Sequence, residues 1–179
     1  MSDKTDQLLE RIAIALESNL PGKKTGLIDI VTTVYLYVGR GEEEASNCCW
    51  YTRFGGVNIP QSSNGLAGKL VKIETRETEY KGKKSEKLQI WMKCGDQDYC
   101  VQSGLDTLFS RGVLLALTET SVGQEITIGV KPSKDDEKIV FGSIATASGW
   151  VRSEWDKDTS EQVLFDQALN AINSLPIGG

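Results

Sequence analysis

The sequence predicts a mainly β fold: a five-stranded Greek-key barrel of the OB type with helical appendages at both ends. Two long alternating runs joined by a basic turn lie between residues 66 and 94, and a third strand, a helix and two more strands follow before residue 151. The resulting order of elements (β-β-β-α-β-β) in so short a stretch is typical of such a barrel. We expect an N-terminal appendage over residues 1–45, the barrel over 46–151 and a C-terminal appendage over 152–179.

The first barrel strand is expected over residues 66–80, with a bulge or kink near Gly68. Such a kink lets one long strand serve both halves of a small barrel. The strand ends at the turn 81–84, where Gly82 suits a positive φ angle.

The second strand, residues 87–94, alternates strictly between apolar and other side chains. Leu88, Ile90, Met92 and Cys94 point one way, and Lys87, Gln89, Trp91 and Lys93 the other. Because the apolar set must face the core, we expect Trp91 on the outer face between two lysines.

The remaining elements follow from periodicity and end signals. A strand over 98–102 leads into a helix that Ser103 or Asp106 can cap and that runs to about Thr118. Strands over 125–130 and 138–146 complete the barrel, and a helix is expected over 158–175. N-terminal to the barrel, residues 3–19 predict a helix, and 26–38 fit either a strand or a buried helix.

A cluster of aromatic residues precedes the barrel strands. Trp50, Tyr51 and Phe54 lie within five positions, before a loop rich in Gly, Ser and Asn. They fit either a plug for the open end of the barrel or a part of its binding face.

Composition excludes several classes of function. The chain has 179 residues, a net charge of −5 and a pI of about 4.9, which argues against coating nucleic acid by bulk charge alone. No apolar run approaches a membrane span and the N-terminus lacks the pattern of a secretion signal, so we expect a cytoplasmic protein. No nucleotide-binding or hydrolase motif is present, so we expect neither an enzyme nor a bound cofactor.

Four cysteines and no histidine leave little scope for metal or nucleophile chemistry. The cysteine spacing does not match the paired ligands of a zinc site. We expect reduced, partly buried thiols, with a hairpin disulfide between Cys94 and Cys100, or a metal, as the alternatives left open.

The first hairpin is basic within an acidic chain. From Gly68 to Lys93 there are eight basic and four acidic residues, a local charge of +4. Such a hairpin suits a groove that follows a single nucleic-acid strand. The alternative is a solvated, lysine-rich hairpin that blocks edge pairing.

Trp91 gives this surface its most specific signal. An outward indole needs cover, which either a stacked base or an appendage lying across the sheet could supply. In the first case we expect single-stranded DNA binding, with RNA left open, and in the second a protein-protein adaptor using the same face. The expected binding residues are Trp91, Tyr99 and Tyr80 for bases, and Lys72, Arg76, Lys83, Lys84, Lys87 and Lys93 for phosphates. The terminal helices could also form a contact within a homo-oligomer or with a partner protein.

The same stretch carries a resemblance. The sequence AGKLVKIETRETEYKGKKSEKLQIWMKCGDQDYCVQSG, followed by LDTLFSRGVLLAL, resembles cyanobacterial and phage proteins related to the single-stranded-DNA-binding replication protein A. The shared pattern is a first strand ending in E-Y-K-G-K, a second strand, a third strand of the form Y-x-V-x-S-G, and a helix. It covers roughly Trp50 to Asp156. The resemblance implies an OB fold and single-stranded DNA binding.

Overall fold

The protein folds around one open sheet of mixed strand direction. The computed structural model describes residues 33–40 and 47–174, which belong to one compact unit, residues 32–179. Nine strands are found in the described part, in the order β3-β2-β1-β6-β5-β4-β7-β8-β9. The helix expected over residues 3–19 lies outside the described residues. Both expected domain boundaries, at residues 46 and 152, fall inside the compact unit.

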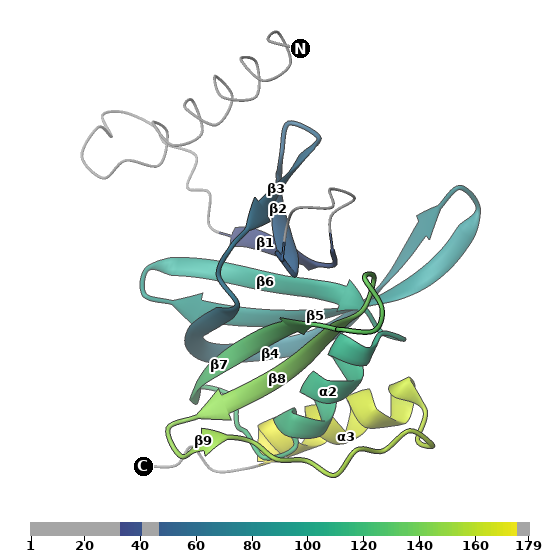
Figure 1. The fold of residues 1–179 in the computed structure, drawn as a ribbon. Helices are drawn as coiled ribbons and strands as arrows, with labels where there is room; N and C mark the ends of the chain where they lie inside the picture. Colours follow the sequence, from purple (N-terminus) through teal and green to yellow (C-terminus); the bar gives the residue numbers. More distant parts are fainter. Residues whose placement is uncertain (1–32, 41–46, 175–179) are drawn as a thin grey trace, which may run out of the picture. The chain divides into compact units, whose positions relative to one another are not determined.

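The helices and strands are labelled in Figure 1. The strands are β1 (Thr33–Val38), β2 (Trp50–Phe54), β3 (Val57–Gln61), β4 (Gly65–Tyr80), β5 (Lys83–Cys94), β6 (Gln97–Gly104), β7 (Glu125–Pro132), β8 (Val140–Thr146) and β9 (Gly149–Trp150). The helices are α2 (Leu108–Leu117) and α3 (Glu161–Ser174).

The predicted five-stranded OB barrel is wrong. The five strands and the helix between the third and fourth exist, as β4, β5, β6, α2, β7 and β8. Closing them into a barrel would require β6 to pair with β8. Instead β6 pairs in parallel with β1, and the outer edge of β8 pairs with β9. Because residues 33–61 add three strands beyond β6, the sheet extends where a barrel would close.

β4 changes partners along its length, as the kink argument requires. Its first residues pair with β7 and the remainder pairs with β5, with Lys69 opposite both Glu125 and Lys93. Gly68 stands at this crossing, where a Cβ atom would lie 2.6 Å from the carbonyl oxygen of Lys93. The register irregularity itself falls between Leu70 and Lys72, slightly beyond the predicted position.

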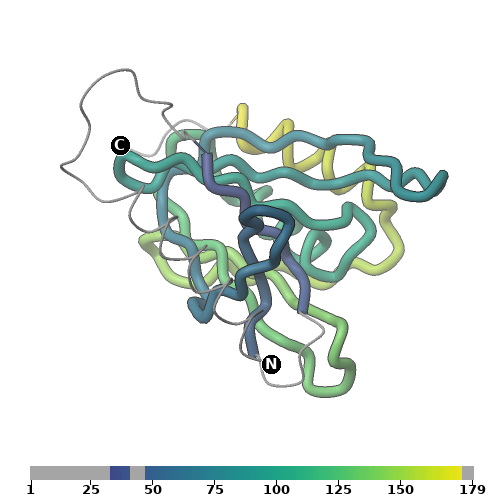
Figure 2. Tube along the Cα trace, turned by 90° about the horizontal axis from the view of Figure 1, so that it is seen from above, coloured from purple at the N-terminus to yellow at the C-terminus, as the bar shows by residue number. Residues whose placement is uncertain are grey.

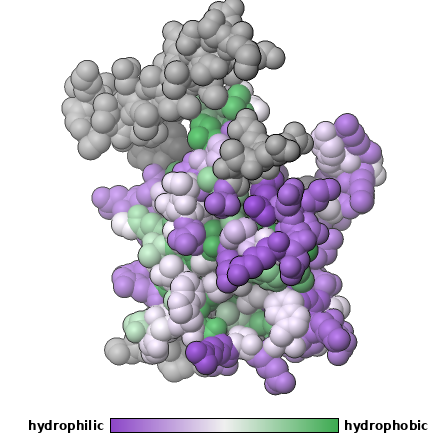
Figure 3. All heavy atoms as spheres, in the orientation of Figure 1, coloured by the Kyte–Doolittle hydropathy of each residue, from purple (hydrophilic) through white to green (hydrophobic). Residues whose placement is uncertain are grey.

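The β4–β5 hairpin extends beyond the rest of the sheet. Its two-residue turn has φ angles of 50° at Lys81 and 75° at Gly82, as the glycine predicted. Figure 2 shows the hairpin reaching past the other strands, and Figure 3 shows its end as a mostly hydrophilic surface. Because β4 and β5 pair with no other strand near the turn, both sheet faces are open to solvent there.

One face of the sheet holds the core. Leu88, Ile90 and Met92 are fully buried, which confirms the predicted inward set of β5. The helix α2 covers this face and packs against β8. Its N-cap is Thr107, whose side chain accepts a hydrogen bond from the Ser110 amide, in place of the expected Ser103 or Asp106.

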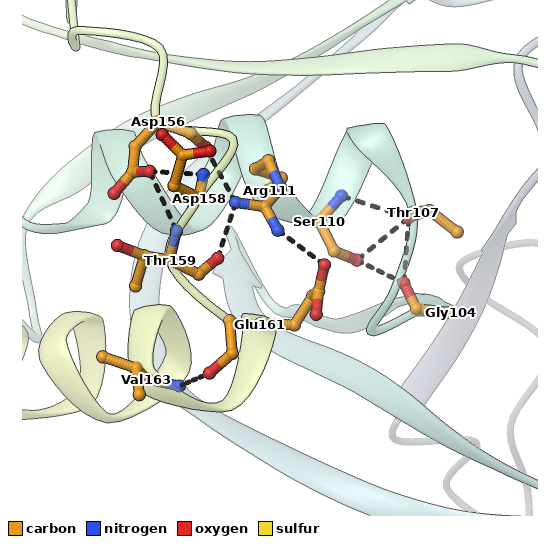
Figure 4. Close-up of polar contacts among 10 residues, drawn as sticks. Gly104, Thr107, Ser110, Arg111, Asp156, Asp158, Thr159, Glu161 and Val163 are labelled. Carbon is orange, nitrogen blue, oxygen red and sulfur yellow. Dashed lines mark hydrogen bonds and ion pairs between the residues drawn. The ribbon is translucent and has the colours of Figure 1, made fainter.

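Arg111 on α2 fastens the C-terminal segment to the core. Its guanidinium donates hydrogen bonds to the carbonyl oxygens of Asp156 (2.7 Å) and Thr159 (2.9 Å) and pairs with Glu161 at the start of α3 (Figure 4). Only 8% of the residue is exposed. The helix α3 contributes its own buried side chains to the same core. Arg111 therefore sets the path of the chain between β9 and α3.

Replacing Arg111 by alanine is expected to destabilise the fold by about 2–3 kcal/mol, because hydrogen bonds to a charged, buried group are lost together. Arg111→Lys keeps the positive charge but loses the planar guanidinium that donates to several acceptors at once, so an intermediate loss of stability is expected. Urea unfolding of the three proteins at pH 7 measures both changes. Equal midpoints for Arg111→Ala and the unmodified protein would contradict this role.

The stability that comes from the segment around Arg111 depends on pH. Hydrogen bonds from Thr159 lower the pKa of Asp156, and its own backbone amide, followed by Arg111, lowers the pKa of Glu161. Both carboxyls therefore stabilise the fold above their unfolded-state pKa of about 4, and this stability is lost as pH falls through the folded-state values. Arg111→Ala should weaken, without abolishing, the loss of stability between about pH 5 and pH 3.

Candidate nucleic-acid interface

The face opposite α2 carries Trp91 and is here called the Trp91 face. Strand register assigns its side chains: Lys72 lies opposite Trp91, Trp91 opposite Cys100, and Cys100 opposite Tyr35. The neighbouring row runs from Glu74 through Gln89, Gln102 and Tyr37 to Tyr51. The predicted outward orientation of Trp91, Lys87 and Lys93 is confirmed by this pairing, because Leu88, Ile90 and Met92 occupy the other face.

Four aromatic rings form a continuous series across this face, here called the aromatic row. Tyr35 meets Trp91 edge to face, with ring centroids 6.1 Å apart and an interplanar angle of 75°. Tyr35 and Tyr37 are offset-stacked at 6.3 Å, and Tyr37 and Tyr51 at 5.6 Å. All four side chains are half-buried. The row therefore joins three strands, β5, β1 and β2, through ring contacts.

A small residue under the row lets Trp91 and Tyr35 meet. Cys100 of β6 stands between them in the register and is fully buried. Burial, followed by the nearby Glu74 carboxylate, raises the pKa of its thiol to about 12. Cys100 is therefore a neutral spacer at neutral pH, and its side chain is small enough for the two rings to approach above it.

Polar contacts fix the orientation of the Trp91 ring. Its Nε1 donates a hydrogen bond of 2.8 Å to Glu74 Oε1, and the same carboxylate pairs with Lys72 at 2.9 Å. The Lys72 ammonium lies 4.9 Å from the indole centroid, a cation–π distance. Because Lys72 and Glu74 of β4 both contact the indole, its orientation is fixed before any ligand binds.

Arg53 occupies the other end of the aromatic row. Its guanidinium carbon lies 4.8 Å from the Tyr37 ring centroid and 5.6 Å from that of Tyr51. Asn58 Oδ1 accepts a hydrogen bond of 2.9 Å from its Nε, which orients the plane. The row thus begins and ends beside a cationic side chain.

A groove of about 330 Å³ adjoins this end of the row. Tyr37, Tyr51, Arg53, Tyr80, Lys87 and Gln102 contribute to its lining. It lies between the strands β1 and β2 and the projecting β4–β5 hairpin. Its lining has two cationic side chains and no acidic one.

The predicted basic residues divide into two groups. Lys72, Lys84 and Lys93 each form an ion pair, with Glu74, Glu77 and Asp98 respectively. Arg76, Lys83 and Lys87 form no ion pair within the described part of the chain. A phosphate would compete with a carboxylate for the first group and would meet the second directly.

The predicted stacking residues are not brought together as a set. Tyr99 lies opposite Met92 on the core face and packs against the core, away from Trp91. Tyr80 is on the hairpin end, 74% exposed, with the Lys81 ammonium 5.3 Å from its ring. Trp91 is contacted from β1 by Tyr35, while α3 packs with α2 on the opposite face. The C-terminal helix therefore does not cover Trp91.

Tyr35, Tyr37 and Arg53 are not among the binding residues that the sequence predicts, whereas Tyr51 belongs to the aromatic cluster for which a place on the binding face is one interpretation. The alternation Val34-Tyr35-Leu36-Tyr37-Val38 signals a strand with two tyrosines on one face, and residues 33–38 are a strand. The aromatic cluster of Trp50, Tyr51 and Phe54 is expected either to fill the core or to join the binding face, and its members do both. Trp50 is 2% exposed and fills the core, whereas Tyr51 joins the aromatic row.

The four cysteines form no disulfide with one another. Cys48, Cys49, Cys94 and Cys100 are free thiols, which confirms the expectation of reduced cysteines. Cys94 faces the core and Cys100 the opposite side, which excludes the alternative hairpin disulfide. Within the described residues, no group of three or more His, Cys, Asp or Glu side chains could hold a metal ion. None of the described helices is long and apolar enough to cross a bilayer.

No protein-family model, curated protein or solved structure matches this chain. The relation to replication protein A therefore stays a prediction from the quoted residues, and the OB barrel that it implied is not the observed fold.

Proposed function

We propose that the Trp91 face binds single-stranded DNA. The observation that carries the proposal is the aromatic row, four contacting rings that run across the sheet with a cation at each end. Aromatic side chains on an open sheet are stacking platforms for unpaired bases, and each stack contributes about 1–3 kcal/mol.

Phosphate contacts complete the proposed interface. Arg53, Arg76, Lys83 and Lys87 lie on or beside the groove and the hairpin, and an arginine or lysine there can follow a backbone that passes over the rings. The chain as a whole carries −5, so attraction is local to this face. Local attraction on an acidic body favours a bound strand in one groove over general coating.

Single strands are favoured over duplexes by the chemistry of the row. Ring faces interact with the faces of bases, which a duplex keeps stacked on each other. The groove of about 330 Å³ also lies against the sheet, where splayed nucleotides fit better than a rigid double helix.

Anisotropy of a fluorescent dT12, titrated with the protein at 50 and 200 mM salt, tests the function. We expect saturable binding at micromolar protein that weakens with salt, with a log–log slope of about −2 to −3 for three or four phosphate contacts. A matched 12-base-pair duplex should bind at least about tenfold more weakly. Absence of any anisotropy change at micromolar protein in 50 mM salt would overturn the proposal, and equal duplex binding would overturn base stacking. An rU12 arm decides between DNA and RNA.

A protein-binding role for the same face is the second candidate. The ion pairs of Lys72 and Lys93 favour it, since these charges are already neutralised within the chain. Lys84, which pairs with Glu77, lies on the other face of the hairpin. Tyrosine, tryptophan and arginine are also the residues enriched in protein interfaces. A face that binds no oligonucleotide under the conditions above supports this second role.

A further inference from the structure

Trp150 presents a second exposed indole on the same sheet face. It lies on β9 opposite Ala145 of β8, and 61% of the residue is exposed. Its ring rests on Gly129 of β7: a Cβ atom built there would lie 2.9 Å from Trp150 Cη2. Only glycine leaves room for this contact, and most of the Trp150 side chain stays exposed to solvent.

A groove of about 850 Å³ opens beside Trp150. Lys131, Ser143 and the loop Ser62–Gly65 contribute to its other walls. The groove lining contains one cationic side chain and no acidic one. An indole wall, hydroxyl groups and a lysine are the chemistry that a nucleotide needs: a stacking surface, hydrogen-bond partners and a phosphate contact.

This groove adjoins a depression that reaches toward the aromatic row. Thr127 lines both it and a neighbouring depression of about 620 Å³. That depression is lined by Lys69, Lys93 and Glu125, and Lys93 lies two residues from Trp91 on β5. All three hollows on the Trp91 face thus have a net positive lining. The depression at the start of α2, on the other side of the sheet, has one Asp106 and one Lys138.

We propose that Trp150 is a second stacking platform for the same single strand, which runs from the groove beside Tyr51 across the sheet to β9. This inference rests on the proposed function. Seven strand-to-strand steps separate β2 from β9 along the sheet, and at about 4.8 Å each the path over its surface is about 34 Å long. The sheet curves, because Asn47 and Cys49, which precede β2, line the same groove as Trp150. A stacked strand covers that distance with about 10 nucleotides at 3.4 Å each.

Length-dependent binding tests this path. Affinities of dT4, dT8, dT12 and dT16 are measured by anisotropy for the unmodified protein and for Trp150→Ala, Trp150→Phe and Lys131→Ala. For the unmodified protein, affinity should rise up to about 10 nucleotides and then level off. Trp150→Ala should weaken dT12 binding about 5- to 150-fold and move the plateau to a shorter oligonucleotide. Trp150→Phe should recover part of the loss, and Lys131→Ala should reduce the salt slope by about one.

The matched control is Trp155→Ala, an equally large loss from an indole that is 50% exposed and lies outside these three grooves. It should bind dT12 as the unmodified protein does. Unchanged dT12 affinity and plateau in both Trp150→Ala and Lys131→Ala, with binding by the unmodified protein intact, would overturn the extended path alone. Absence of binding by the unmodified protein at every length would overturn the proposed function and this inference together. Lys131→Ala keeps the test valid if Trp150→Ala fails to fold.

Discussion

Replacing Tyr37 and Trp91 together by alanine is expected to weaken dT12 binding by about 2–6 kcal/mol, since two stacking platforms contribute about 1–3 kcal/mol each. At about 1.4 kcal/mol per tenfold change, the loss is at least about 30-fold. Tyr37 is the central ring, in contact with Tyr35, Tyr51 and the Arg53 guanidinium. Its removal therefore breaks the aromatic row in the middle as well as removing one platform.

Single variants of Trp91 separate the contribution of stacking from that of the hydrogen bond to Glu74. Trp91→Ala also leaves the Glu74 carboxylate without its indole partner, which adds repulsion toward a phosphate. Trp91→Phe removes the same hydrogen bond but keeps a ring, so a smaller loss than for alanine identifies stacking. Trp155→Ala is again the control, and thermal unfolding must show that each variant is folded. Full dT12 affinity in the folded double variant would contradict the role of the aromatic row.

Gly142→Ala is expected to lower the free energy of unfolding by about 3 kcal/mol, the upper part of the usual range for overpacking. A Cβ atom at this position of β8 would lie 2.6 Å from side-chain atoms of Phe109 and Val113 and 2.7 Å from the Phe109 carbonyl oxygen. These atoms belong to α2, so the helix would have to move away from the sheet.

Gly112→Ala tests the opposite side of the same contact. Alanine favours an exposed helix by about 1 kcal/mol over glycine, but here its Cβ atom would lie 2.5 Å from the Gly142 carbonyl oxygen. We expect the packing effect to win and the protein to be destabilised. Urea unfolding measures both variants, with Gly65→Ala as control, because its Cβ atom would make ordinary contacts at 3.5 Å. A Gly142→Ala protein as stable as this control would contradict the close packing of α2 on β8.

Local patterns predicted much of the β4–β9 region. Strict alternation in β5 placed Leu88 inside and Trp91 outside, and Gly82 predicted the hairpin turn. The core position of Tyr99 follows from the turn that precedes β6. Cys94 pairs with Gln97 across a two-residue turn, and counting back from that turn places Tyr99 opposite Met92. The register therefore assigns Tyr99 to the core face.

The sheet edges could not be predicted in the same way. Whether β6 pairs with β8 or with β1 depends on competition between distant segments, and periodicity carries no information about partners. The pattern of residues 26–38 fits either a strand or a buried helix, and it contains nothing that specifies a parallel pairing with β6. Because that pairing brings Tyr35 and Tyr37 beside Trp91, the aromatic row could not be predicted either.

The parallel pairing of β1 with β6 has a consequence for the order of folding. It joins residue 33 to residue 98, whereas β4–β5, β5–β6 and β7–β8 are hairpins that close short loops. Pairings between distant segments form slowly because their loop entropy is lost before their contacts are gained. Until β1 docks, β6 presents an unpaired edge, which is a template for aggregation. We therefore expect the aromatic row to be completed only after the local hairpins of β5 and β6 have formed.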